Sequence, residues 1–173
     1  VQELKHLAEA AIDARRDWLI GAAKTVLDNA EPGFQEVKTA RLVSEKLDEL
    51  GIDHEGGIAL TGIKGYLRKP GESDGPTLSV IGELDSLKVA GHPHADPETG
   101  AAHACGHHCQ IGMMLGTAVG LLVPEVHEQL SDNVAMMALP AEEFIDVEYR
   151  WGLHQEGKVG LMSGKQEFIR LGA

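Results

Sequence analysis

The sequence is poor in basic residues and in cysteine. Its 173 residues include 15 Lys and Arg against 27 Asp and Glu, for a formal net charge of −12. This excess of negative charge repels phosphate backbones and anionic lipid surfaces, so we expect no nucleic-acid partner and no membrane partner. The two cysteines, Cys105 and Cys109, are separated by about one helical turn, a spacing that rarely gives disulfide geometry. We therefore expect free thiols and a reducing compartment.

The N-terminal region lacks the long apolar run of a signal peptide or a membrane span. Charged residues such as Glu3, Lys5, Glu9 and Asp13 interrupt it at short intervals. We therefore expect a cytoplasmic protein. The hydrophobic content of 43% is ordinary for a globular chain, and a chain of this size folds without help from disulfides or metal. Any metal is thus expected to serve chemistry.

The pattern of apolar residues predicts an α/β fold. Helical spacing predicts helices at residues 2–28, 35–50 and 107–122 and a helix end at 165–173. Strands are predicted at 58–60 and 62–68, and buried strands at 78–81 and 134–139. Residues 89–104 are predicted to be a loop. This order predicts helical layers around a partly parallel sheet, with functional groups beyond the carboxyl ends of its strands.

Histidine and cysteine are concentrated between His92 and Cys109, which include five of the nine histidines and both cysteines. The centre of this segment reads His103-Ala104-Cys105-Gly106-His107-His108-Cys109. Thiolate and imidazole are ligands for zinc and neighbouring first-row metals. Gly106 would let the backbone turn so that Cys105 and His107 could reach one ion.

Three other interpretations of this segment stay open from the residues alone. A structural zinc knuckle needs a second pair of ligands nearby, and the sequence has none. Cys105 could be a nucleophile activated by a neighbouring histidine. Buried histidines that form ordinary hydrogen bonds would explain one or two of these residues, but hardly five histidines together with two thiols.

Acidic residues follow both predicted buried strands. Glu142 and Glu143 come directly after an apolar strand and Pro140. Adjacent carboxylates point in different directions, so one could bind a metal while the other acts as a proton shuttle. Most Glu-Glu pairs are solvated surface charge, and only the position of this pair favours a site. Asp85 follows the other strand and could either orient a metal ligand or cap the turn.

Four segments in order resemble a known family: Gly82-Glu83-Leu84-Asp85-Ser86-Leu87, His103-Ala104-Cys105-Gly106-His107, Met113-Met114-Leu115-Gly116 and Leu139-Pro140-Ala141-Glu142-Glu143. They are similar to the metal-dependent amidohydrolases and peptidases of the aminoacylase and carboxypeptidase type. The most similar branch holds the indole-acetyl-amino-acid, hippurate and p-aminobenzoyl-glutamate hydrolases. The resemblance implies a three-layer helix–sheet–helix catalytic domain with a mixed, partly parallel sheet, zinc-exopeptidase-like and incomplete.

The resemblance also implies roles for single residues. Cys105, His107 and Glu143 match metal ligands, with Cys105 bridging where two ions bind. Glu142 matches the general base, and Asp85 matches the acidic residue that supports the metal site. The implied cofactor is one or two divalent ions, zinc or manganese. His108 stands where the family pattern has Asp, which leaves the preferred metal open.

By the same resemblance, residues 1–173 are the N-terminal portion of a catalytic metallohydrolase domain. The lid or dimerisation domain, the C-terminal return and two further histidine ligands are then absent. The implied reaction is hydrolysis of an amide bond in a small N-acyl-amino acid or dipeptide, with weak or no turnover by this portion alone. We expect a homo-oligomer. The alternative is a non-catalytic module that binds metal or pairs with a partner chain.

Overall fold

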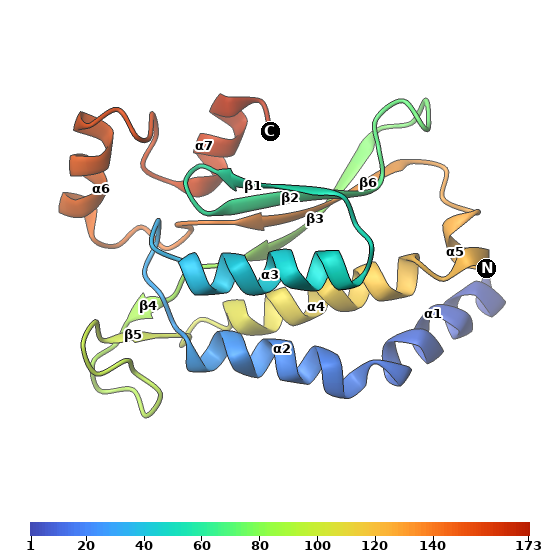
Figure 1. Ribbon diagram of the computed structural model, residues 1–173, viewed down its shortest axis with the longest axis horizontal. Coiled ribbons are helices and arrows are strands. Elements are labelled where there is room, and N and C mark those ends of the chain that lie inside the picture. The colour runs from blue at the N-terminus through green and yellow to red at the C-terminus, as the bar shows by residue number, and fades with distance from the viewer.

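The computed structural model describes residues 1–173 and is built around one four-stranded sheet (Figure 1). The strand order is β1-β2-β6-β3, with bounds β1 (His54–Ile58), β2 (Gly62–Arg68), β3 (Thr77–Glu83) and β6 (Asn133–Leu139). β3 pairs with β6 in parallel, while the β1/β2 and β2/β6 pairs are antiparallel. The predicted mixed, partly parallel sheet is therefore confirmed.

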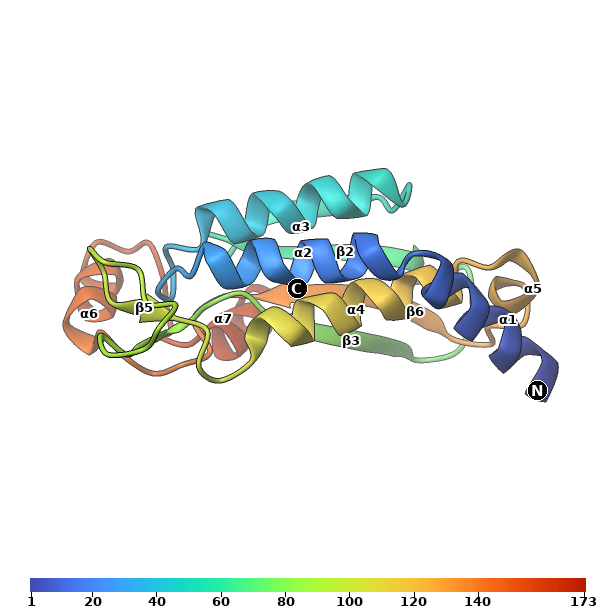
Figure 2. The same ribbon diagram turned by 90° about the horizontal axis from the view of Figure 1, so that it is seen from below.

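Helices cover both faces of this sheet. Their bounds are α1 (Gln2–Ala14), α2 (Arg16–Asp28), α3 (Val37–Glu49), α4 (His107–Leu121), α5 (Pro124–His127), α6 (Val147–Gln155) and α7 (Gly164–Leu171). Figures 1 and 2 show α2, α3 and α4 on one side of the sheet, with α6 and α7 on the other. None of the helices combines the length and the apolar character needed to cross a membrane.

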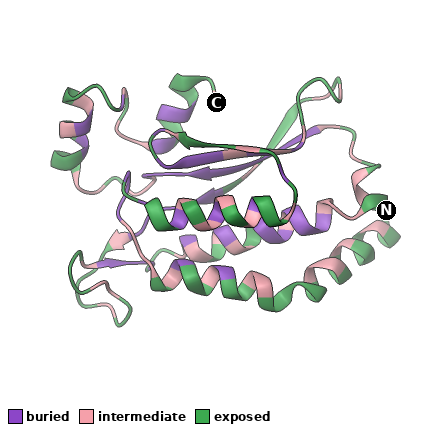
Figure 3. Cartoon of the chain, in the orientation of Figure 1, coloured by how far each residue is buried: buried purple, intermediate pink, exposed green.

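α4 lies at the centre of the larger of two hydrophobic clusters. Its buried residues Ile111, Met114 and Leu115 pack with residues of α2, α3, β2 and β6. A smaller cluster on the opposite face joins β6 to Phe168 of α7 and Leu153 of α6. β6 is buried over its whole length, because both clusters cover it (Figure 3).

The single helix predicted over residues 2–28 is wrong, because the chain breaks it at Arg15. This residue has φ −103° and ψ 14°, which separates α1 from α2. Both helices pack against α4: α2 lies against its N-terminal half and α1 against its C-terminal end. Added Cβ atoms at Gly112 and Gly120 of α4 would lie 3.3 Å from Ala23 and 3.2 Å from Ile12, so small residues permit this approach.

The prediction that residues 78–81 form a buried strand is right about the strand, β3, but wrong about its burial. Leu78 is 61% exposed and Ile81 is also exposed; only Gly82 and Glu83 are buried. The reason is topological: β3 is an edge strand that pairs with β6 alone. The apolar run Leu78–Ile81 thus predicted the strand correctly, but it did not predict that the strand lies at the edge of the sheet.

Other boundaries differ for local reasons. Residues 58–60 were predicted as a strand, but β1 ends at Ile58, and Ala59 and Leu60 have positive φ values of 49° and 77° in the turn to β2. The predicted loop over 89–104 contains a strand that the sequence did not indicate, since β4 (Leu87–Lys88) pairs with β5 (Ala101–Ala102). The short helix α5 and the helix α6 were not predicted either.

The central role of α4 gives a test of the fold. Leu115 is fully buried, so Leu115→Ala should lower the free energy of unfolding by about 3 kcal/mol through lost burial and the cavity left behind. Met113 lies on the same helix but is 65% exposed, so Met113→Ala should change it by less than about 0.5 kcal/mol. Urea unfolding of both variants measures this, and equal losses would contradict the described packing.

Candidate metal centre

The carboxyl ends of β3 and β6 lie side by side and carry the acidic groups. The parallel register pairs Glu83 with Leu139, and the Leu84 N–H donates to the Leu139 carbonyl at 2.9 Å. Beyond these residues the chain runs to Asp85 on one side and to Glu142 and Glu143 on the other. The four acidic side chains therefore leave the same edge of the sheet, as the sequence pattern predicted for Asp85 and the Glu-Glu pair.

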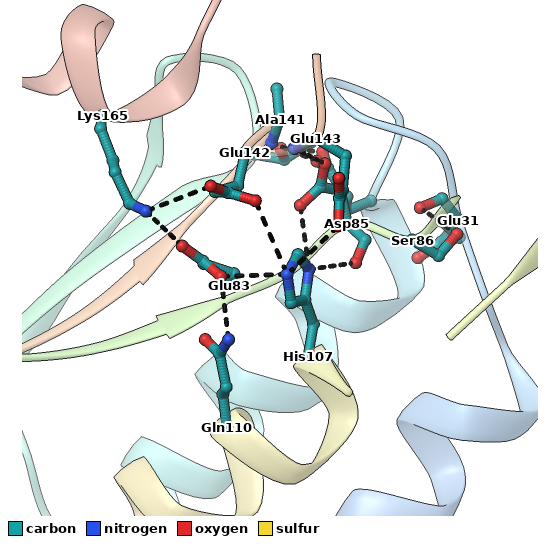
Figure 4. A network of polar contacts seen from close by, with 12 residues as sticks. Glu31, Glu83, Asp85, Ser86, His107, Gln110, Ala141, Glu142, Glu143 and Lys165 are labelled. Carbon is teal, nitrogen blue, oxygen red and sulfur yellow. Dashed lines mark hydrogen bonds and ion pairs between the residues drawn. The ribbon is translucent and has the colours of Figure 1, made fainter. Parts of the chain in front are cut away.

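α4 begins at this edge and brings His107 into the middle of the acidic groups (Figure 4). Gly106, directly before the helix, has φ +101°, a left-handed conformation that favours glycine. The backbone turn predicted at Gly106 is therefore present. The His107 side chain is 2% exposed.

The two ring nitrogens of His107 have separate partners. Nδ1 lies 2.8 Å from the backbone carbonyl of Asp85, to which it donates. Nε2 lies 3.0 Å from Glu83 Oε2, 3.7 Å from Glu142 Oε2 and 3.8 Å from Glu143 Oε1. The carbonyl fixes the ring so that Nε2 faces the carboxylates, which is the arrangement commonly found for a metal-ligating histidine.

Asp85 connects the two strand ends. Its side chain is fully buried, and Oδ2 accepts a hydrogen bond from the Glu143 N–H at 2.9 Å. Its carbonyl holds His107 at the same time. Asp85 thus contacts both His107 and the backbone of Glu143, and this geometry matches an orienting residue better than a simple turn cap.

The surrounding charge changes the pKa of both His107 and Cys105. Burial alone lowers the pKa of His107, but hydrogen bonds to Asp85 and the nearby carboxylates outweigh it and raise the pKa to about 9. A hydrogen bond with Glu143, burial and the neighbouring carboxylates raise the pKa of the exposed Cys105 thiol. Without a metal ion, the proton on His107 therefore adds a positive charge that partly balances the carboxylates, and the Cys105 thiol adds no further negative charge.

Two overlapping sets of side chains at this edge could hold a metal ion. Ligand atoms of Cys105, His107 and Glu143 all lie within 4.8 Å of one another, as do those of Glu83, His107 and Glu142. Both sets use His107. A thiol, an imidazole nitrogen and a carboxylate oxygen suit zinc and other first-row divalent ions, so the residues of the first set fit such an ion.

Three further residues at the site, Glu83, Gln110 and Lys165, were not predicted from the sequence. Lys165 of α7 forms ion pairs with Glu83 and, at 3.5 Å, with Glu142. Gln110 Nε2 donates to Glu83 Oε2 at 2.9 Å. Glu83 lies only two residues before Asp85, so its place at the strand end was a usable signal. Lys165 had no such signal because α7 reaches the site through tertiary packing alone.

Several members of the histidine and cysteine segment belong to neither of these two ligand sets. His92 and His94 pack against each other in the loop between β4 and β5, with ring centroids 5.9 Å apart. Cys109 is exposed on α4, with Sγ 3.3 Å from His108 Nε2. His103 is buried and forms no side-chain hydrogen bond. Both cysteines are free thiols.

Comparisons with known proteins point to one family, although no family model matches the chain. IAA-amino acid hydrolase ILR1-like 5 of Arabidopsis thaliana is 33% identical over 130 residues, which are 73% of this chain and 29% of that protein. Thermostable carboxypeptidase 2 of Saccharolobus solfataricus is 32% identical over 131 residues, which are 73% of this chain and 32% of that protein. The solved structure of the Bacillus subtilis YXEP protein, described as a dinuclear metal-binding peptidase from the M20 family, has a TM-score of 0.62 at 28% identity and covers 76% of this chain and 37% of that one.

The fold is an α/β domain, and about three quarters of the chain is similar to proteins described as hydrolases and metal-binding peptidases. More narrowly, the matched residues relate this chain to the metal-dependent amidohydrolases and peptidases of the aminoacylase and carboxypeptidase type. The resemblance stated from the four sequence segments is therefore confirmed. The chain spans about a third of the length of the relatives that it matches.

The protonation of His107 predicts a pH dependence of stability. Its folded pKa of about 9 lies above the ordinary value of 6.5, so its contribution is complete below pH 6.5 and is lost as the pH rises through 9. The metal-free chain should then lose up to about 3 kcal/mol of unfolding free energy over this range. Urea unfolding with chelator present at several pH values measures the loss.

Two histidine variants test whether this loss of unfolding free energy arises from His107. His107→Gln should flatten the profile between pH 6.5 and 9, whereas His6→Gln, at an exposed position on α1, should keep it. A His107→Gln profile with the slope of the unmodified chain would show that the loss arises elsewhere.

Proposed function

We propose that this chain carries the metal site of an amidohydrolase, with Cys105, His107 and Glu143 as ligands. The observation that carries the proposal is the convergence of these three donors within 4.8 Å at the carboxyl edge of β3 and β6. The ligand assignment made from the resemblance is consistent with this geometry. The proposed cofactor is one or two divalent ions, zinc or manganese: thiolate and imidazole are ligands for zinc, and carboxylate is a ligand for either ion.

Charge compensation favours this set over Glu83, His107 and Glu142. Lys165 pairs with both Glu83 and Glu142, so these carboxylates already have a cation beside them. Ligand atoms of Glu143 and Cys105 lie within 4.8 Å of each other, and neither residue has an ion pair with a lysine or arginine. A divalent cation would supply the charge that they lack.

Glu142 is the general base in this proposal. Its carboxylate lies beside His107 and is one-third exposed, so it can reach both the site and a water molecule from solvent. A bound divalent ion supplies polarisation of the substrate carbonyl and acidification of water. Glu142 would take the proton and return it to the leaving amine, while the backbone contact with Asp85 keeps the neighbouring Glu143 in place.

The proposed substrates are small N-acyl-amino acids or dipeptides. Support comes from the names of the relatives, an IAA-amino acid hydrolase and a carboxypeptidase among them. We further propose that residues 1–173 correspond to the N-terminal portion of the catalytic domain. The cytoplasmic location and the homo-oligomer stay predictions.

The two cysteines provide a matched test of metal binding. Added Co²⁺ should bind the chain with a near-ultraviolet thiolate-to-cobalt absorption band, because a coordinated thiol loses its proton. Cys105→Ser should abolish the band and weaken binding, while Cys109→Ser should change neither. Loss of the band in Cys109→Ser with retention in Cys105→Ser would refute the assignment.

The variant Glu142→Gln tests whether Glu142 acts as the general base or as a metal ligand. The amide keeps the shape of the side chain but cannot take a proton, so hydrolysis of an N-acyl-amino acid should fall by roughly 10²–10⁴-fold. Metal content, measured by elemental analysis of the same preparation, should stay nearly unchanged. Loss of metal from this variant would instead make Glu142 a ligand. The Glu142→Gln variant and the unmodified protein are compared in the same form, one for which hydrolysis by the unmodified protein is measurable.

A further inference from the structure

We propose that Glu36 and Arg150 are positioning residues, which hold the turn after β6 in the conformation that directs Glu143 into the metal centre. The inference rests on the proposed function, because it assigns these residues a purpose at that site. Neither residue contacts the donor atoms, and the two come from parts of the chain far from each other in sequence.

Ala141 is the point at which the chain changes direction between Pro140 and Glu142. It is fully buried and has φ +50°, a conformation that is unfavourable for a residue with a Cβ atom. Such a backbone conformation persists only where surrounding contacts impose it. Both polar backbone groups of Ala141 have partners that could do so.

Glu36 holds the N–H of Ala141. Its carboxylate is fully buried, and Oε1 accepts the Ala141 N–H at 2.8 Å. The other oxygen accepts the Thr61 hydroxyl at 2.6 Å, so each carboxylate oxygen has a defined donor. Glu36 directly precedes α3, and Thr61 lies in the turn between β1 and β2. Through Glu36, Ala141 is therefore tied to both of these segments.

Arg150 holds the carbonyl groups of the same turn. Its guanidinium donates to the carbonyl of Ala141 at 3.1 Å, to that of Met162 at 2.8 Å and to that of Glu143. Arg150 is fully buried, lies 5.5 Å from the ring centroids of Phe34 and Phe144, and forms no ion pair with a carboxylate. A buried charge is costly unless its hydrogen bonds are made. Here two carbonyls of the turn, those of Ala141 and Glu143, and the carbonyl of Met162 supply such bonds.

Gly33 shows how closely this arrangement is packed. A Cβ atom added there would collide with Arg150 Nη2 and lie 2.9 Å from Ala141 Cα. The segment before α3 thus packs directly against both the guanidinium and the turn. A side chain larger than glycine at position 33 would therefore displace the guanidinium or the turn.

The contacts of Glu143 show the consequence for the metal centre. Its N–H is held by Asp85 at 2.9 Å and its carbonyl by Arg150, so its backbone is fixed on both sides. Cys105 and His107 belong to the segment at the start of α4 and make no hydrogen bond to Glu36 or Arg150. Loss of the Glu36 and Arg150 contacts should therefore release Glu143 while leaving the other two donors in place.

Amide hydrogen exchange tests this positioning without metal. In Arg150→Met and in Glu36→Ala, exchange at Ala141 and Glu143 should be faster by on the order of ten-fold or more, because local opening controls exchange. Exchange within β6 should be unchanged. Glu36→Gln should restore slow exchange, because its amide oxygen can accept the Ala141 N–H and its nitrogen can donate to Thr61. Arg150→Lys provides a second, milder variant if Arg150→Met does not fold.

Arg68 offers a matched control. It also donates to backbone carbonyls, those of Leu130 and Glu72, but at the opposite end of the sheet. Arg68→Met should leave exchange at Ala141 and Glu143 unchanged. Circular dichroism confirms that each variant is folded before exchange is compared.

Cobalt binding then tests the link to the site. Loss of an outer contact typically weakens metal affinity by roughly 10–100-fold, and we expect this in Arg150→Met and Glu36→Ala, with the thiolate band of Cys105 retained. Slow exchange at Glu143 in the folded variants, or unchanged cobalt affinity despite fast exchange, would overturn the positioning role. Failure of the unmodified chain to bind cobalt would instead refute the proposed function, while the exchange result would still decide whether Glu36 and Arg150 hold the turn.

Discussion

The parallel pairing of β3 with β6 brings all the acidic groups of the candidate metal centre to one edge of the sheet. Because Glu83 is opposite Leu139 in the register, the acidic residues after each strand leave the sheet at the same edge. An antiparallel pair would have placed Asp85 and Glu143 at opposite edges. The hydrogen bond from the Glu143 N–H to Asp85 is possible only in this arrangement, and the start of α4 adds His107 between the two segments.

The edge so formed concentrates negative charge around one imidazole. Lys165 balances part of it at Glu83 and Glu142, while His107 and Cys105 keep protons in the metal-free chain. A divalent cation bound as proposed would therefore compete with protons for the same groups. The rigid supports of this edge, Asp85 for His107 and the contacts of Glu36 and Arg150 for the turn, keep the donors close despite their mutual repulsion.

Much of this arrangement could be predicted from the sequence, for identifiable reasons. The apolar run before Glu142 and Glu143 and the glycine between Cys105 and His107 are local signals, and local signals predicted β6 and the start of α4. The edge position of β3 and the break at Arg15 depend on tertiary packing, which short-range patterns do not contain. Lys165, Glu36 and Arg150 were missed because their roles arise from contacts between distant segments, and each in isolation is typical of an ordinary surface residue.

The most direct test of the account is a crystal structure of the chain with zinc, in which anomalous scattering locates the ion. The account predicts a peak about 2.3 Å from Cys105 Sγ, about 2.0–2.1 Å from His107 Nε2 and about 2.0–2.2 Å from a Glu143 oxygen. A peak between Glu83 and Glu142 with Lys165 displaced, or no peak at this edge of the sheet, would contradict it.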